Sequence, residues 1–180
     1  MRKQTKLVAV LSTAALLAIG ASMTSFAATG WAEEDGTWVY YNRDGERATD
    51  QWKKSGNNWY WLDSNGEMAI DQLIEDGDNY YYVDINGVMA ANQWVAIDNE
   101  DAGQDDEPDH YWYYFQANGK ALTNGDNDKV SLKTINGKKY AFDDEGKMLY
   151  GWVSEDNAER VDDTDGDGFK EGTYYFGGED

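Results

Sequence analysis

The chain has 180 residues, no cysteine, and a formal net charge of −20 from 35 acidic and 15 basic side chains. This excess of carboxylates argues against binding to nucleic acids or anionic lipid surfaces, since both require clusters of Lys and Arg. Without cysteine the chain has no disulfide, thiolate zinc site or catalytic thiol. Eight Trp and thirteen Tyr in regular spacing argue against disorder, despite the high charge.

The first 27 residues have the organisation of a secretory signal peptide. Arg2, Lys3 and Lys6 form a basic start, an apolar run covers 7–19, and Ala27 ends a short segment suited to cleavage. An uncleaved anchor is the alternative, but the apolar run is short for a membrane span. We expect secretion and no membrane association after cleavage. The mature chain, 28–180, loses three basic and no acidic residues, so it is more acidic still.

A period of 21 residues follows the signal segment. Each unit has an aromatic run, a turn, a second aromatic run and a tail that resembles Gly-x-Met. The marker positions are Trp31, Trp52, Leu73 and Trp94, with Gly45, Gly66 and Gly87 in step. Such a period is typical of a stacked array in which neighbours cover each other. The predicted units are 29–50, 51–71, 72–92, 93–124, 125–150 and 151–180, the last one incomplete.

Each unit is predicted to be a β-hairpin. The run 38–41 is short, aromatic and β-branched, and turn residues bound it. Asn136-Gly137 between two strand-like runs predicts a type I′ turn. An acidic insert at 99–110 splits the fourth unit and is loop-like. No helical pattern follows the signal segment, so the expected fold is an all-β solenoid of about six stacked hairpins.

Strand alternation sorts the aromatic residues into two faces. Residues seven and five before each tail glycine share one face. These pairs are Trp38/Tyr40, Trp59/Trp61, Tyr80/Tyr82 and Trp112/Tyr114. The intervening residues are expected to build a thin core, and the paired residues an aromatic cluster between neighbouring hairpins. Three rings around a quaternary ammonium contribute about 2 kcal/mol or more when water is excluded. Sugars also stack on flat rings, and the rings could equally serve packing alone.

These residues carry a family resemblance. Gly30-Trp31, the run Trp59-Tyr60-Trp61-Leu62 and the tail Gly66-Glu67-Met68 resemble the choline-binding, or cell-wall-binding, repeats of Gram-positive surface proteins. The segments 135–140 and 146–148 fit the same pattern. Glucan-binding repeats and clostridial toxin repeats are related. The resemblance covers essentially the whole mature chain, and it implies a hairpin solenoid that binds ligand between consecutive hairpins.

The resemblance also implies specific cages. Carried over position by position, the first cage is Trp31, Trp38 and Trp61, and the second is Trp52, Trp59 and Tyr82, with Met68 or Met89 nearby. The third unit has Leu73 and Tyr80 where the pattern has Trp. The fourth unit has Trp94 and Trp112, but Ala141 stands at the partner position of the fifth. Two ligand sites are therefore expected.

The acidic loop of the last unit resembles the opening of a calcium loop. Asp163, Asp165 and Asp167 take positions one, three and five, and Glu171 takes position nine. Position twelve, where a bidentate Glu belongs, is Tyr174. A solvated hairpin turn is the alternative to calcium binding, and no cofactor is expected to be required.

The sequence favours a secreted, noncatalytic cell-wall-binding protein that recognises choline-bearing teichoic acid or a similar wall glycopolymer. Its carboxylates sit in turns and do not converge on an apolar pocket that could separate their pKa values, so no enzyme is expected. One alternative is a glucan-binding adhesin. Another is the binding fragment of a longer wall hydrolase. Self-association through an uncovered last hairpin stays open.

Overall fold

The computed structural model describes residues 29–104, 108–158, 160–161 and 173–177. The predicted signal segment lies outside these residues, and so does the loop with the four predicted calcium ligands, Asp163, Asp165, Asp167 and Glu171. The described part of the chain contains β-strands and no helix. Among these residues, then, there is no helix of the length and apolarity that a membrane crossing requires.

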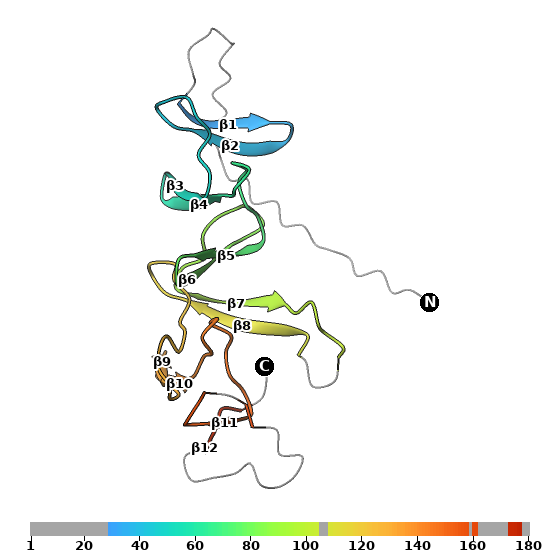
Figure 1. The fold of residues 1–180 in the computed structure, drawn as a ribbon, viewed down its shortest axis with the longest axis vertical. Helices are drawn as coiled ribbons and strands as arrows, with labels where there is room; N and C mark the ends of the chain where they lie inside the picture. Colours follow the sequence, from blue (N-terminus) through green and yellow to red (C-terminus); the bar gives the residue numbers. More distant parts are fainter. Residues whose placement is uncertain (1–28, 105–107, 159, 162–172, 178–180) are drawn as a thin grey trace, which may run out of the picture.

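The described strands form six two-stranded antiparallel sheets, each a hairpin of consecutive strands. Hairpins 1 to 6 are β1 (Gly30–Glu34) with β2 (Thr37–Tyr41), β3 (Gln51–Ser55) with β4 (Asn58–Leu62), β5 (Gln72–Asp76) with β6 (Asn79–Val83), β7 (Gln93–Asp98) with β8 (His110–Phe115), β9 (Lys133–Ile135) with β10 (Lys138–Tyr140), and β11 (Trp152–Ser154) with β12 (Thr173–Tyr175). They follow one another along the long axis of the molecule (Figure 1). The predicted all-β hairpin solenoid is confirmed.

The hairpin turns follow from residues that accept a left-handed backbone. In hairpin 1 the turn residues Asp35 and Gly36 have φ of 50° and 85°, and in hairpin 5 Asn136 and Gly137 have φ of 49° and 81°. Two consecutive positive φ values are the mark of a type I′ turn, whose twist matches that of the flanking strands. The turn predicted at Asn136-Gly137 is therefore confirmed.

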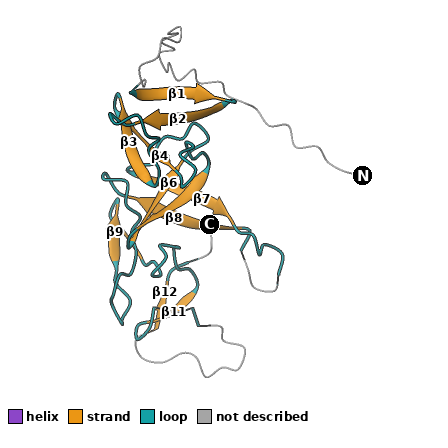
Figure 2. Cartoon of the chain, turned by 45° about the horizontal axis from the view of Figure 1, so that its top comes forward, coloured by secondary structure: helices purple, strands orange, loops and turns teal. Residues whose placement is uncertain are grey.

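The tails of the second to fifth units join their hairpins to the hairpin before. In the second unit Met68 forms an isolated bridge with Leu62 of its own hairpin, while Glu67 forms one with Val39 of hairpin 1. The Met68 amide also donates a hydrogen bond to the Trp38 carbonyl at 2.8 Å. Because these bonds join separate sheets, they satisfy backbone groups that a lone hairpin would leave unpaired. Figure 2 shows the loops that carry these tails beside the strands.

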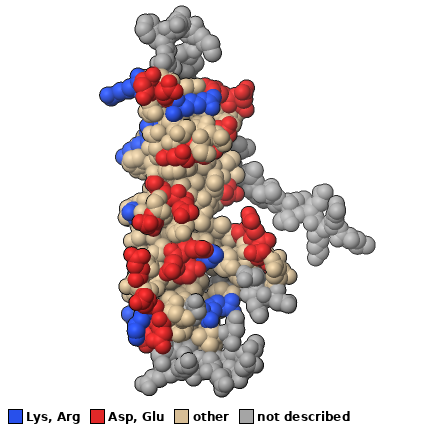
Figure 3. Space-filling view, in the orientation of Figure 1, with Lys and Arg blue, Asp and Glu red and all other residues tan. Residues whose placement is uncertain are grey.

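The core is a narrow column along the stacked hairpins. Val39, Leu62, Val83 and Phe115 are each at most 1% exposed. All four lie on the strand face predicted to build the thin core, which is thus confirmed. Small residues of the tails, Ala48, Ala69, Ala90 and Ala121, are buried beside them. Acidic side chains spread over several levels of the column surface on the face seen in Figure 3.

Candidate ligand-binding sites between hairpins

We use "junction" for the contact between one hairpin and the next, numbered from the N-terminus. The ring on the first strand of a hairpin packs against a ring opposite it on the second strand. Ring centroids are 5.4 Å apart for Trp31 and Tyr40, 5.2 Å for Trp52 and Trp61, and 5.2 Å for Trp94 and Tyr114. These pairs are also Cα partners in the antiparallel register. Each pair presents one aromatic face to the next hairpin.

The next hairpin contributes one ring from its second strand. Trp31 lies 5.3 Å from Tyr60, Trp52 lies 5.1 Å from Tyr81, and Trp94 lies 4.8 Å from Tyr140, measured between ring centroids. All three tyrosines stand six residues before the tail glycine of their unit. The same geometry therefore recurs at the first, second and fourth junctions.

This geometry differs from the cages carried over from the family resemblance. Trp61 packs against Trp52 and is 8% exposed, so it belongs to the second junction and not to the first with Trp31. Tyr82 stacks on Phe115 with centroids 6.1 Å apart, which places it at the third junction. The physical reason is strand alternation, since adjacent residues point to opposite sides of a hairpin. Tyr60 and Tyr81 take the places expected for Trp61 and Tyr82.

The remaining predicted residues lie where the tails cross the strands. Trp38 lies on the same strand face as Tyr40. Its carbonyl accepts a hydrogen bond from the Met68 amide. In the next unit the Met89 amide donates to the Trp59 carbonyl at 2.9 Å. Trp59 is 40% exposed, so part of its ring is free for a ligand. The structure thus places Met68 beside the first junction and Met89 beside the second.

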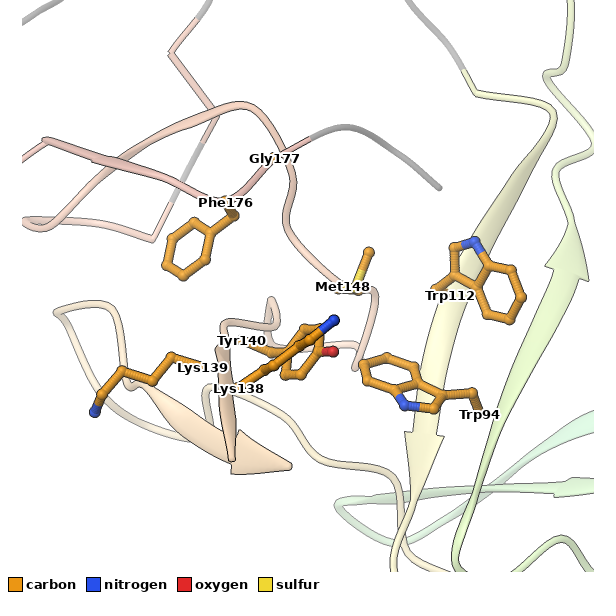
Figure 4. Close-up of a pocket in the computed structure, with 8 residues that line it drawn as sticks. All are labelled: Trp94, Trp112, Lys138, Lys139, Tyr140, Met148, Phe176 and Gly177. Carbon is orange, nitrogen blue, oxygen red and sulfur yellow. The ribbon is translucent and has the colours of Figure 1, made fainter. Parts of the chain in front are cut away.

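The fourth junction holds a pocket that the sequence reasoning missed. Its cavity has a volume of about 540 Å³, and its lining is Trp94, Trp112, Lys138, Lys139, Tyr140, Met148, Phe176 and Gly177. Figure 4 shows the Trp94 and Tyr140 rings close together beside the Met148 thioether, with Trp112 across from them. We call this cavity the fourth-junction pocket. It contains two Trp, one Tyr and one Met around a common space.

The pocket could have been predicted from the position of Tyr140 relative to the tail glycine of its unit. Ala141 stands five residues before Gly146, at the position from which the family resemblance implies the cage ring. Tyr140 stands six residues before Gly146, as Tyr60 stands six before Gly66. Ala141 itself is fully buried in the core. The Met148 amide donates to the Trp112 carbonyl at 2.7 Å, which repeats the tail contact of the earlier units.

The third junction is closed by apolar packing. Leu73, Tyr80 and Tyr82 pack against a buried cluster that includes Tyr113 and Phe115. Burial is the main reason why the pKa of the Tyr113 hydroxyl lies above its ordinary value, and the carboxylates of the next unit add to the effect. Leu73 stands where the neighbouring units have a Trp on the first strand. The third junction therefore lacks the indole ring that would form one side of a cage. The lack of a predicted site here agrees with this packing.

The aromatic rings of the first two junctions already lie against ammonium groups of the chain. The Lys53 Nζ atom is 4.7 Å from the Tyr40 ring centroid and donates a hydrogen bond to the Asn42 side-chain oxygen at 2.8 Å. The Lys54 Nζ atom is 5.8 Å from the Trp59 ring centroid. These contacts lie in the range of a cation–π interaction. The rings are therefore placed so that a cation can reach their faces.

Metal ligands do not gather in the part of the chain that the structure describes. No group of three or more His, Asp or Glu side chains there has an arrangement that could hold a metal ion. The calcium prediction concerns residues outside this part, so it stays a prediction.

Comparison with known proteins agrees with this repeated geometry. Residues 28–72 and 49–94 match the sequence model of the choline-binding repeat, and residues 111–121 match a cell wall binding repeat. The choline-binding domain of Spr1274 from Streptococcus pneumoniae is 33% identical, with 53% of this chain and 95% of that chain covered and a TM-score of 0.39. The chain belongs to the choline-binding repeat family.

Two longer proteins are also similar to this chain. CbpJ from Streptococcus pneumoniae TIGR4 is 28% identical over 71% of this chain and 37% of that chain, with a TM-score of 0.49. Choline binding protein F from Streptococcus pneumoniae, solved in the presence of a peptidoglycan analogue, is 26% identical over 71% of this chain and 36% of that chain, with a TM-score of 0.47. This chain therefore spans little more than a third of each. No curated protein sequence matches it.

Proposed function

We propose that this chain is a secreted, noncatalytic protein that attaches to the cell wall by binding choline groups of teichoic acid or a similar wall glycopolymer. The observation that carries the proposal is the fourth-junction pocket, where Trp94, Trp112 and Tyr140 surround a cavity beside Met148. A trimethylammonium group is apolar in surface yet positive, so it gains both from leaving water and from the electron-rich faces of the rings. The polarizable Met thioether adds an adaptable apolar wall.

The first and second junctions support the same proposal. Trp31 and Tyr60 form one ring contact and Trp52 and Tyr81 the other, and each junction has a Trp of the second strand beside a Met tail. With the fourth junction this makes three candidate sites. The spacing of sites along a column suits a polymer that carries many choline groups, because linked weak sites raise the overall affinity.

The glucan-binding alternative has less support after the fold is known. This alternative needs open rows of tyrosines at the third to fifth junctions, which suit sugars better than a closed cage. In the structure Tyr80 and Tyr82 pack against the buried cluster of the fourth hairpin instead. The binding-fragment alternative is unaffected, because a wall-binding array serves an enzyme equally well.

Retention on a trimethylammonium resin tests the proposal. We expect the wild-type protein to be retained and to elute with free choline. A triple variant, Trp38→Ala, Trp59→Ala and Trp112→Ala, should pass through the column, because it removes one ring from each candidate site. Trp152→Ala is the control, since Trp152 is 42% exposed on the last hairpin and does not line the pocket. Failure of the folded wild type to bind the resin would contradict the proposal, and a glycan array would then test the sugar alternative.

A further inference from the structure

The chain has five Asn-Gly sequences, and one of them differs from the other four in its surroundings. The asparagines are Asn65, Asn86, Asn118, Asn124 and Asn136. In such a sequence the glycine amide nitrogen can attack the side-chain carbonyl carbon of the asparagine, because glycine has no side chain to shield the nitrogen. The attack requires that the glycine nitrogen and the asparagine side chain are both free to move.

Three of the sequences lie in the tail turns, where the glycine is fixed. Each glycine amide donates a hydrogen bond to a carbonyl three residues earlier. The bonds are Gly66 to Asp63 at 2.9 Å, Gly87 to Asp84 at 2.7 Å and Gly119 to Gln116 at 2.9 Å. All three glycines are buried. Each of these nitrogens must therefore give up a hydrogen bond in a packed turn before it can attack.

The fourth sequence is fixed through its asparagine. Asn124 is 2% exposed. Its side-chain nitrogen donates to the Asn127 carbonyl at 2.8 Å and the Lys129 carbonyl at 3.3 Å, and its side-chain oxygen accepts from the Ser131 amide at 2.8 Å. This side chain cannot turn toward the Gly125 nitrogen without breaking these bonds.

Asn136-Gly137 has neither restraint. Both residues are exposed at the tip of hairpin 5. Within the part of the chain that the structure describes, neither the Gly137 amide nor the Asn136 side chain makes a hydrogen bond. A Cβ atom at Gly137 would meet nothing within 4 Å, so the space around the reacting nitrogen is open. Lys138 and Lys139 follow directly, and their positive charges favour the oxyanion that develops during the attack.

We propose that Asn136 is a site of spontaneous deamidation and isoaspartate formation, and the first Asn-Gly sequence of the folded protein to react. The Gly137 nitrogen bonds to the side-chain carbonyl carbon of Asn136, and the bond from this carbon to the side-chain nitrogen breaks. The proton of the Gly137 amide departs with that nitrogen as ammonia, and a cyclic succinimide remains. Water then opens the ring at either carbonyl. One opening gives an aspartyl residue, and the other gives an isoaspartyl residue whose backbone runs through the former side chain.

The two products have different consequences for hairpin 5. Aspartate fits the turn, because Asp35 and Gly36 adopt φ of 50° and 85° in hairpin 1, close to the 49° and 81° of this turn. An isoaspartyl residue adds a backbone carbon to a turn whose flanking strands have only three residues each. Tyr140 pairs with Lys133 in this short hairpin, so we expect the isoaspartyl product to displace Tyr140 from Trp94. The fourth-junction pocket then loses choline affinity as the protein ages, a consequence that rests on the proposed function.

Peptide mapping by mass spectrometry, during storage of the folded protein in mildly alkaline buffer, tests the site. We expect Asn136 to deamidate about fivefold faster than any of the other four asparagines, since loss of one hydrogen bond costs about 1 kcal/mol. The same protein in concentrated urea is the control, and there the difference should shrink because the folded restraints are gone. If another Asn-Gly sequence reacts first in the folded protein, or if urea leaves the difference unchanged, the assignment is wrong.

The aspartyl and isoaspartyl products, separated by ion exchange, test the effect on hairpin 5. Hydrogen exchange of the β10 amides should be faster in the isoaspartyl product and unchanged in the aspartyl product. Asn136→Asp should keep the hairpin intact and form isoaspartate much more slowly, because a carboxylate is a poor electrophile. Unchanged hydrogen exchange in the isoaspartyl product would overturn the effect on the hairpin.

Choline titration separates this inference from the proposed function. In a background with Trp38→Ala and Trp59→Ala, the isoaspartyl product should bind choline about fivefold more weakly than fresh protein, as expected for loss of one ring. Equal affinity would show that the turn does not control the pocket. If fresh background protein already fails to bind choline, the proposed function is wrong at this junction, whereas the peptide map still decides the deamidation site.

Discussion

Trp94 and Tyr140 lie close together across the fourth junction, with ring centroids 4.8 Å apart and ring planes tilted by 60° to each other. The two residues come from different hairpins, and their contact closes one side of the fourth-junction pocket. The same relationship joins Trp52 to Tyr81 at the second junction. The ring that completes a site thus comes from the second strand of the following hairpin, where it lies between two hairpins.

Replacement of the Tyr140 ring should remove most of the choline affinity of the fourth-junction pocket. Loss of one cage ring removes about 1 kcal/mol of cation–π attraction, or roughly a fivefold loss of affinity. Titration of Tyr140→Ala with choline, in the background that carries Trp38→Ala and Trp59→Ala, measures this loss. Tyr140→Phe keeps the ring face and should bind choline nearly as well as its parent. Equal binding by Tyr140→Ala would show that the ligand does not touch this ring.

The second junction offers a direct test of strand register. Tyr81 contacts Trp52, whereas Tyr82 stacks on Phe115 and donates its hydroxyl hydrogen to Asp71. Tyr81→Leu should weaken choline binding at this junction severalfold and lower stability little. Tyr82→Leu should lower the free energy of unfolding by about 1–3 kcal/mol, because it removes a packed ring and its hydrogen bond.

Choline titrations followed by indole fluorescence, together with urea unfolding, separate these two effects. A background with Trp38→Ala and Trp112→Ala removes the contributions of the first and fourth junctions. The reverse outcome, with choline affinity lost in Tyr82→Leu and kept in Tyr81→Leu, would restore the cage with Tyr82 that the family resemblance implies.

A close backbone approach at Gly87 should make the tail of the third unit intolerant of any side chain. A Cβ atom there would lie 2.9 Å from the Met68 Cε atom and 3.0 Å from the Ala69 carbonyl oxygen. Gly77 has a similar left-handed φ, 61° against 74°, but open space around it. Gly77→Ala should therefore cost only the backbone strain, roughly 1–2 kcal/mol. Gly87→Ala should cost about 1–3 kcal/mol more, because it also overpacks the junction.

Urea unfolding of the two alanine variants measures the difference. Similar losses at both positions would mean that the Met68 side chain and the tail move aside without cost.

Burial of Asp143 should make its contribution to stability depend on pH. Burial raises the pKa of the Asp143 carboxyl above its ordinary value, although the Lys147 amide, which donates to it at 2.8 Å, works in the opposite direction. A raised pKa means that the folded state favours the protonated acid, so the charged form destabilises the fold at neutral pH. Asp143→Asn should then be more stable than wild type at pH 7, and this advantage should shrink as pH falls through the pKa of the folded carboxyl toward its ordinary value.

Melting temperatures of wild type and Asp143→Asn between pH 3 and 7 provide the measurement. Asp144→Asn removes the same charge from the exposed neighbour and should show a smaller advantage that varies less with pH. If both variants behave alike, the effect reflects relief of overall charge repulsion and not burial of Asp143.

Much of the fold could be predicted because it depends on local chemistry. The turn at Asn136-Gly137 needs left-handed backbone, and few residues other than Asn and Gly accept it. The alternation of Val39 and Tyr40 places one residue in the core and one at the junction, whatever the hairpin packs against. The insert after Asp98 lacks apolar residues in strand register, and its described residues, 99–104 and 108–109, lie outside the strands.

The candidate sites were harder to predict because they join residues of different hairpins. Trp61 and Tyr60 are adjacent in sequence, and both are aromatic, so composition alone could not assign one of them to Trp31. In the fifth unit the strands are only three residues long, and Tyr140 is the last residue of β10. This short hairpin makes the repeat pattern of the sequence less regular in the fifth unit. The tyrosine six residues before the tail glycine is nevertheless present.

The sequence by itself determined the repeat, the hairpins, the turns and the face of each strand, because these follow from steric limits within a few residues. Only the tertiary structure decided which faces meet, and hence that Tyr140 joins Trp94 and Trp112 while Lys138 lies beside them. The direction in which one hairpin stacks on the next depends on the tail hydrogen bonds, such as that from Met148 to Trp112. Those bonds span separate units, and no local pattern encodes them.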